Sequence, residues 1–344
     1  MPGSPYITAQ HTSVRSVMLK VLAALIPGIL VHTWFFGPGI WVSLLVCTFF
    51  AYAFEALALA MRNQPLQPFL SDASVLVTAW LLALSLPTLA PWWLYAVGML
   101  FAVLVAKHLY GGLGQNLFNP AMVGYAALIV SFPAYMTVWP APESLAGHTP
   151  DLLEALDLVF AGQGAVSPDA YTTATPLDTL RTAVRAGGDA AAVMQQPLFG
   201  NLGARGQEMI ALMYLLGGLL LINYRVISWH IPVAFLAAIV LTAGGLHLLD
   251  PGRHAGPLFH LVAGGSMLGA FFILTDPVSA SATPRGKLIY AGLAGFITVI
   301  IRAYGGYPDG VAFSVLLMNM AVPFIDAHTQ PKVFGQTAKR KDSR

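Results

Sequence analysis

The most constraining feature of this sequence is a series of about ten apolar runs, several of them as long as the roughly 20 residues that a helix needs to cross a bilayer. The runs lie at residues 16–36, 40–61, 73–86, 92–109, 121–139, 209–222, 230–249, 258–274, 288–303 and 311–325. Those at 73–86 and 209–222 are short for a full span. Only 9% of the residues are charged, against about 25% in a soluble domain. We therefore predict an all-α integral membrane protein.

The Lys and Arg residues between the runs orient the chain, because cytoplasmic loops are enriched in these residues. One side collects the bases of the short connections and of the C-terminal tail, namely Arg15, Arg62, Lys107, Arg225, Arg285, Lys287, Lys332, Lys339, Arg340, Lys341 and Arg344. With ten spans, residues 1–15 and 327–344 are predicted to be cytoplasmic tails. The long polar segment at residues 140–208 is predicted to be extracytoplasmic.

Two parts of the chain resemble each other. SVLVTAWLLALSLPTLAP at 74–91 parallels SMLGAFFILTDPVSASATP at 266–284, and YGGLGQN at 110–116 parallels YGGYPDG at 304–310. We predict two repeats, residues 16–139 and 209–326, which five helices each would leave inverted in the membrane, as in many transporters. The alternative is that these Gly and Pro residues only mark turns. Non-helical backbone here must line a cavity, a cofactor or a partner, because its amides cannot face lipid.

Several classes of site are excluded by composition. A formal net charge of +2 gives no indication of a nucleic-acid partner. The single cysteine, Cys47, provides neither a disulfide framework nor an iron–sulfur cluster held by this chain alone. The nine histidines are scattered without ligand spacing, so we predict no metal site. No acid–base or nucleophilic catalytic residues are predicted.

The stretch DAYTTATPLDTL at residues 169–180 concentrates hydroxyls in the long polar segment. Thr175 followed by Pro176, with Asp178 in the capping-box position, predicts the start of a helix. A capped surface helix explains these residues by itself. A helix N-terminus, however, also attracts phosphate. The stretch further resembles the acceptor pattern Asp-x-x-Ser/Thr-Gly-Ala-Ser/Thr at which flavin transferases attach FMN, with Thr173 in place of the preferred glycine.

Longer motifs carry a family resemblance over nearly the whole chain. They are SDAS at 71–74, YGGLGQNLFNPAMVGY at 110–125, TDPVSASATPRGKLIY at 275–290 and GGYPDGVAFSVLLMN at 305–319. The chain resembles the flavin-bearing membrane subunits of Rnf-type ion-translocating oxidoreductases and of the sodium-pumping NADH:quinone reductase. The resemblance implies a bacterial inner-membrane subunit, inactive alone, of a translocase that couples electron transfer from NADH or ferredoxin to ion movement. Its partners would be a periplasmic flavin subunit and iron–sulfur subunits.

The resemblance also implies two cofactors. FMN would be esterified through its phosphate to Thr175, with Thr172, Thr173 and Asp178 around it, and riboflavin would bind without a covalent bond in the membrane part. We place the riboflavin at the loop 111–120, whose polar residues suit the edge of an isoalloxazine ring. These residues are Gln115, Asn116 and Asn119. Alternatively, Asn119 is only a helix cap and Asn116 only a turn residue.

Glu55 lies inside the second run, and an acid within a membrane span is a candidate for an ion path. The alternatives are a side chain that reaches the interface or one paired with Lys20. An inverted repeat would equally suit a passive channel or a secondary transporter for a small solute, which is the rival function. Colour distinguishes the two, because a flavoprotein is yellow and a channel is colourless.

Overall fold

The first half of the chain forms five apolar helical segments and two short helices. In a computed structural model that describes residues 13–162 and 170–330, α1 (Val14–Phe36) and α2 (Gly39–Met61) are followed by the short α3 (Leu66–Leu70). Next come α4 (Ser74–Ala83) and α5 (Trp92–Leu100), and α5 continues directly as the π-helix η1 (Phe101–His108). Helix α6 (Pro120–Ser131) and the short α7 (Pro133–Met136) complete this half.

The polar segment between the halves contains short elements. Its helices are α8 (Leu152–Ala161), α9 (Pro176–Arg185) and α10 (Ala190–Val193). Two strands of two residues each, β1 (Trp139–Pro140) and β2 (Thr172–Thr173), pair antiparallel with Trp139 opposite Thr173. The all-α prediction omitted this small sheet, which is too short to leave a periodic signal in the sequence.

The second half begins with α11 (Gln207–Asn223) and α12 (His230–Leu249). The run predicted at 258–274 is interrupted: α13 (Pro257–Val262) ends before Gly264, and α14 (Ser266–Leu268) leads into a second π-helix, η3 (Gly269–Ile273). Gly264 has a φ of +65°, a conformation that favours glycine and breaks the helix. Helices α15 (Pro284–Tyr304) and α16 (Val311–Thr329) close the bundle.

The lengths of these helices support a multi-pass membrane protein. Within residues 13–162 and 170–330, five helices are long and apolar enough to cross a bilayer: α1, α2, α12, α15 and α16. Helices α4, α6 and α11 and the continuous segment of α5 and η1 are apolar but shorter. The short lengths predicted for the third and sixth runs are confirmed by α4 and α11. Ten spans and an inverted repeat remain predictions.

Close backbone contacts hold the bundle together. Helix α1 of the first half packs against α11 of the second, and α12 packs against α15. Gly217 brings α11 onto the Ala24 carbonyl of α1, and Gly295 brings α15 onto the Phe235 carbonyl of α12. A Cβ at either glycine would collide with that carbonyl. These glycines therefore set the helix separation, as small residues do at helix contacts in membranes.

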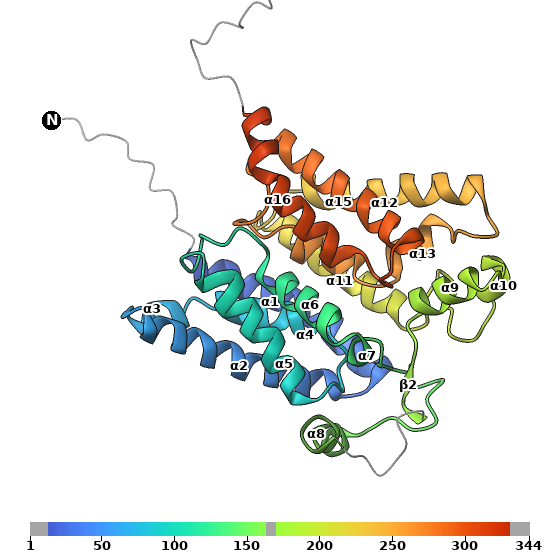
Figure 1. Cartoon of the computed structure of the whole chain (residues 1–344), viewed down its shortest axis with the longest axis horizontal. Coiled ribbons are helices and arrows are strands. Elements are labelled where there is room, and N and C mark those ends of the chain that lie inside the picture. Colours follow the sequence, from blue (N-terminus) through green and yellow to red (C-terminus); the bar gives the residue numbers. More distant parts are fainter. Residues whose placement is uncertain (1–12, 163–169, 331–344) are drawn as a thin grey trace, which may run out of the picture.

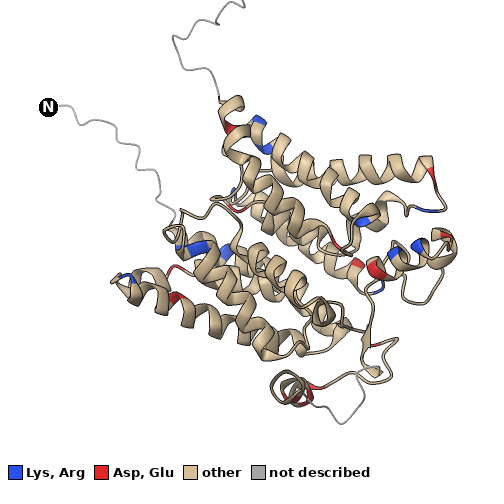
Figure 2. Cartoon of the chain, in the orientation of Figure 1, with Lys and Arg blue, Asp and Glu red and all other residues tan. Residues whose placement is uncertain are grey.

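The molecule has two distinct ends. Helices α8, α9 and α10 gather at one end of the bundle, and the start of α1 and the end of α16 lie toward the other (Figure 1). Charged residues lie mainly near the helix ends and in the polar segment, and the middle of the bundle is almost free of them (Figure 2). This arrangement fits a bilayer around the apolar middle. Which end faces the cytoplasm remains a prediction from Lys and Arg.

Candidate functional site

Two cavities lie where the halves meet. The first, which we call the Thr175 cavity, has a volume of about 160 Å³. The second, which we call the Lys107 cavity, has a volume of about 130 Å³. They share a wall, since Met122 and Ile273 line the first while their neighbours Ala121 and Phe272 line the second. The start of α6 and η3 therefore lie between the two cavities.

Thr175 begins α9, as the sequence predicts. Its Oγ1 accepts a hydrogen bond from the Asp178 backbone N–H at 3.2 Å, and Pro176 occupies the first helical position. The Asp178 carboxylate, predicted to complete a capping box, instead accepts from Arg181 Nη2 at 2.5 Å. The reason is local: one helical turn brings this arginine beside the acid, where charge attraction favours the pair.

Helix α9 is fixed against the second half by both faces. Leu177 and Leu180 pack into a small apolar cluster with Phe259 of α13. On the polar face, Arg181 donates to the Gly306 carbonyl and Arg185 donates to the Gly305 carbonyl, the latter at 2.6 Å. The helix N-terminus, with its unpaired amides and partial positive charge, is therefore held in one place beside the cavity.

The other predicted hydroxyls lie differently. Thr172 and Thr173 form β2, and neither is among the described residues that line the Thr175 cavity. Thr173, which replaces the preferred glycine of the acceptor pattern, has the extended backbone of a strand, so this departure causes no strain at φ. Asp169, the first residue of that pattern, lies outside the described residues.

The Thr175 cavity offers the flat apolar surface that a planar aromatic group needs. Thr175 is half-buried on its wall, and Tyr125, Tyr214 and Trp139 supply flat apolar surface. Polar groups are few, as is usual in cofactor sites. Gln207 supplies an amide, and His32 Nδ1 is buried without a hydrogen-bond partner among the described residues. An unpartnered buried nitrogen is costly, so it fits a site that a ligand completes.

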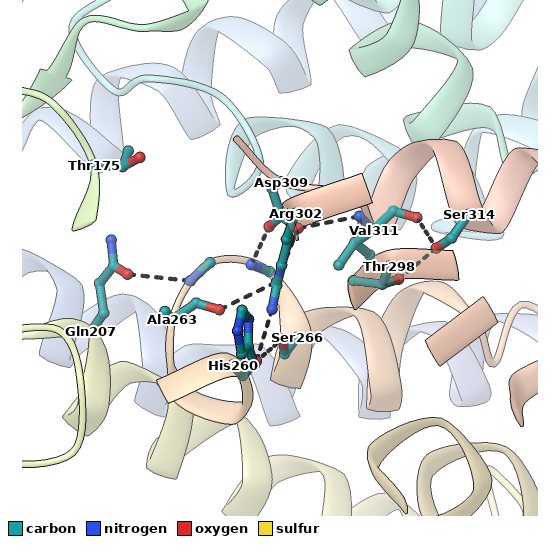
Figure 3. A network of polar contacts seen from close by, with 12 residues as sticks. Thr175, Gln207, His260, Ala263, Ser266, Thr298, Arg302, Asp309, Val311 and Ser314 are labelled. Atoms are coloured by element: carbon teal, nitrogen blue, oxygen red, sulfur yellow. Dashed lines mark hydrogen bonds and ion pairs between the residues drawn. The ribbon is translucent and has the colours of Figure 1, made fainter. Parts of the chain in front are cut away.

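An ion pair between Arg302, which is buried, and Asp309, which lines this cavity, belongs to a network of polar contacts (Figure 3). Arg302 donates to Asp309 Oδ1 from Nε at 3.1 Å and from Nη2 at 2.9 Å. It also donates to the carbonyls of His260, at 2.8 Å, and of Ala263. Asp309 Oδ2 accepts from the Gly265 N–H at 2.7 Å. The network ties the break between α13 and α14 to the loop before α16, with Thr175 and Gln207 facing it.

The Lys107 cavity contains two of the three residues predicted to contact riboflavin. Asn116 and Asn119 line it, whereas Gln115 is exposed and is not among its described lining residues. Asn116 Nδ2 donates to the Phe118 carbonyl at 3.1 Å. The Asn119 side chain accepts from Met122 N at 3.2 Å and donates to the Ile273 carbonyl at 3.1 Å. The predicted cap is thus present, and the Asn119 amide is engaged with protein.

Glu55 is buried on α2, but its partner is not Lys20. Oε1 accepts from Lys107 Nζ at 2.8 Å, and Oε2 lies 3.0 Å from His108 Nε2. Both partners come from the end of η1. This pairing was not predicted, although two basic residues at the end of a long apolar run were a visible signal. Among the described residues, no cluster of three or more His, Cys, Asp or Glu side chains is placed to hold a metal ion.

Comparison with known proteins adds a family to this geometry. Residues 1–335 match the model of the NQR2, RnfD, RnfE family. A protein of Escherichia fergusonii, named as the D subunit of an ion-translocating oxidoreductase complex, is 48% identical over 343 residues, which is 97% of each chain. Proteins of Salmonella arizonae and Salmonella typhi with the same name are 47% identical over the same share. These matches cover both cavities and the polar segment.

Proposed function

The chain belongs to the NQR2, RnfD, RnfE family, and from this premise we propose that it carries electrons between two flavins inside an ion-translocating oxidoreductase. It is a membrane subunit of such a translocase complex, as its relatives' name states. The finer proposal is that FMN is esterified to Thr175 and that a second flavin, riboflavin, binds without a covalent bond in the Lys107 cavity. Its partners would be the other membrane, iron–sulfur and flavin subunits of an Rnf-type complex.

One observation carries the FMN proposal: the Thr175 hydroxyl lies both at the N-terminus of α9 and on the wall of a cavity between the halves. A phosphate on Oγ1 would meet the free amides and the positive end of the helix. The ring would lie among Tyr125, Tyr214 and Trp139, and Gln207 and His32 would offer polar contacts. Bound flavins supply one-electron chemistry, and the chain holds them and excludes water.

The riboflavin proposal is supported by the position of the Lys107 cavity. Neighbouring residues of α6 and η3 line both cavities, so these two elements would form the protein path between the two rings. Of the three predicted contacts, Asn116 is the best placed to touch riboflavin, because its side chain lines the cavity. The Asn119 side chain fixes the cavity wall instead: its N–H group reaches the Ile273 carbonyl of η3.

Flavin fluorescence of the denatured chain in a gel tests the FMN site. We expect fluorescence in the wild type, no fluorescence in Thr175→Ala, and full fluorescence in the matched variants Thr172→Ala and Thr173→Ala. If Thr175→Ala kept its fluorescence, the ester would be on another residue. A colourless wild-type protein would favour the rival channel or transporter.

Acid extraction tests the second flavin. Asn116→Leu removes a polar contact from the cavity wall and adds apolar volume, so we expect the extractable flavin to be lost while the covalent fluorescence remains. Gln115→Leu is the matched control, because that side chain is exposed outside the cavity, and it should keep its flavin. Unchanged extractable flavin in folded Asn116→Leu would place the second cofactor elsewhere.

Both termini are proposed to lie in the cytoplasm of a bacterial inner membrane, with residues 140–208 outside. Cysteine labelling in a Cys47→Ser background tests this arrangement. An impermeant maleimide should label Leu153→Cys on α8, which is 71% exposed, in intact cells. It should label Gln67→Cys on α3 only after lysis. The reverse pattern would contradict the orientation.

A further inference from the structure

The wall of the Lys107 cavity holds a buried cation that a polar flavin pocket does not by itself require. Lys107 is the last residue but one of η1, and its side chain is 4% exposed. Its Nζ donates to Glu55 Oε1 at 2.8 Å and to Ser74 Oγ at 3.2 Å. Taking an ammonium out of water costs several kcal/mol unless such partners compensate. The two acceptors therefore hold the charge at the cavity wall.

The residues behind Lys107 form a series of close polar contacts that leads away from the cavity. Arg62 Nη1 lies 3.2 Å from His108 Nδ1, and a guanidinium can only donate. His108 Nδ1 must therefore accept, which leaves the proton of the neutral imidazole on Nε2, 3.0 Å from Glu55 Oε2. The contact between His108 Nε2 and Glu55 Oε2 is close but does not have the geometry of a hydrogen bond. Among the described residues, the hydrogen-bond donor to the Glu55 side chain is therefore Lys107.

Two charged side chains are among the described residues that line this cavity, the cation Lys107 and the acid Asp276. Lys107 and Arg62 are cations, and Glu55 is the acid that compensates them. Lys107 lines the cavity, whereas Glu55 lies behind it and is not among the described lining residues. The Asp276 carboxylate is engaged within its own loop, where it accepts from Ser279 Oγ at 2.7 Å. A ligand would meet the ammonium before the carboxylate that pairs with it.

We propose that Lys107 is a positioning residue whose ammonium stabilises the negative charge that electrons bring into this cavity, so that it raises the reduction potential of the flavin held there. Glu55, Ser74 and His108 act through Lys107 by fixing and partly offsetting its charge. The inference rests on the proposed second flavin. It follows from Coulomb's law in a site of low dielectric, where a unit charge within several ångström changes the stability of an added charge by more than tenfold.

The measurement is the ratio of the affinities for reduced and oxidised riboflavin, obtained by anaerobic titration of the purified complex after its extractable flavin has been removed. Lys107→Met should lower this ratio by about tenfold or more, because the cation is gone. Lys107→Arg keeps a cation at this position, so its ratio should stay close to that of the wild type. Glu55→Gln should raise the ratio, because Lys107 then lacks its compensating anion. Shifts of opposite sign are the signature of charge, which a merely structural role would not produce.

Two further variants serve as controls for this measurement. Lys20→Met removes a half-buried lysine of α1 that lies beside a different surface pocket with Arg15, and it should leave the ratio unchanged. The double variant Glu55→Gln with Lys107→Met leaves neither of these two charges unpaired, so it should fold even if a single variant does not. Its ratio should also lie below that of the wild type, because the group nearest the ligand was the cation.

The outcomes separate this inference from the proposed function. Riboflavin binding with an unchanged ratio in Lys107→Met and in the double variant would overturn the role of Lys107 and leave the flavin site standing. Failure of the stripped wild type to bind riboflavin would overturn the flavin site and the inference together. A fall in the ratio for Lys107→Met that Lys107→Arg reverses would establish both.

Discussion

Each of the two cavities is lined by one member of an ion pair, and the member that lines the wall is an acid in one cavity and a cation in the other. At the Thr175 cavity the acid Asp309 lines the wall, and its partner Arg302 lies behind it, beside a different pocket. At the Lys107 cavity the cation Lys107 lines the wall, and its partner Glu55 lies behind it. The Lys107–Glu55 pair is buried and Asp309 is half-buried, and the paired side chain that lines the cavity is a cation in one case and an acid in the other. Paired charges can therefore bias two neighbouring redox sites in opposite directions without leaving either charge uncompensated.

The largest effect is expected at the Thr175 cavity, from Arg302→Leu. This change leaves the Asp309 carboxylate without its counterion and removes donors from two carbonyls. Breaking a buried pair in this way costs about 3–5 kcal/mol. We expect loss of monodisperse protein at a lower temperature in detergent, together with loss of covalent flavin. Arg253→Leu is the control, because its pair with Asp250 is exposed and should contribute at most about 1 kcal/mol.

A smaller loss is expected when the two halves are forced apart. Gly217→Ala would place its Cβ against the Ala24 carbonyl, and overpacking of this kind costs about 1–3 kcal/mol. Thermal stability in detergent should fall, and both flavins should bind less well because both cavities lie between the halves. Gly244→Ala on α12, where a Cβ meets no atom within 4 Å, should keep or raise the stability. Equal losses in both variants would contradict the packing argument.

The comparison of the cavities becomes sharper with Asp309→Asn. The amide keeps much of the shape but removes the negative charge that lines the Thr175 cavity. The covalent flavin should then be reduced more readily, opposite in sign to Lys107→Met at the other cavity. We expect a shift below about tenfold in the reduction equilibrium, because several donors already surround this carboxylate. A potentiometric titration of the covalent flavin measures this shift. A lower reduction potential in Asp309→Asn than in the wild type would contradict the opposite roles of the two charges.

The smallest effect concerns the polar segment. At α8 the Asp151 side chain accepts from Glu154 N, and the Glu154 side chain accepts from Asp151 N, which forms a capping box. The hydrogen bond from the Asp151 backbone N–H lowers the pKa of Glu154, and the hydrogen bond from the His148 side chain lowers it further. A lowered pKa in the folded state means that the stabilisation is present above the ordinary pKa and is lost as the pH falls through the folded value.

Hydrogen exchange of α8 measures this loss. Its amides should exchange faster, after correction for intrinsic rates, at about pH 4 than at neutral pH. Glu154→Gln should weaken this pH dependence, because the amide can still accept the hydrogen bond but does not titrate in this range. The buried helices around the two cavities should show no comparable change. If α8 exchanged identically at both pH values, the carboxylate would not be needed for the cap.

Local features of the site were predictable from sequence, and long-range ones were not. The cap at Thr175 depends on residues three positions apart, so the order Thr-Pro-x-Asp was enough to predict it. Glu55 was recognised as unusual because an acid in an apolar run is costly. Its partner, however, lies 52 residues away, and nothing in sequence spacing distinguishes Lys107 from Lys20.

The loop at residues 111–120 illustrates the same limit. Asn119 was predicted both as a possible helix cap and as a ligand contact. The cap, which depends on residues close by in the sequence, is present. The decisive contact is the backbone N–H of Asn119 donating to Asn319 Oδ1 at 3.0 Å, 200 residues away. Gln115 has the same chemistry as Asn116 but points out of the bundle. Which of these two side chains lines the cavity depends on how the two halves pack, and the sequence alone does not show this.

The π-helix η1 affects how the wall of the Lys107 cavity would respond to a change in chain length. Leu109 N donates to Leu104 O, five residues back, so this stretch contains one residue more than an α-helix would need. Deleting a single residue within it, such as Val105, would allow an ordinary α-helix to form at no loss of apolar character. Because the wider turn absorbs the extra residue, the side chains upstream would keep nearly the same orientation relative to Lys107 and His108. A deletion from the α-helical stretch of α5 would instead turn the residues before it by about 100° relative to these two side chains. The charge at the cavity wall therefore depends on where along this helix the chain gains or loses a residue.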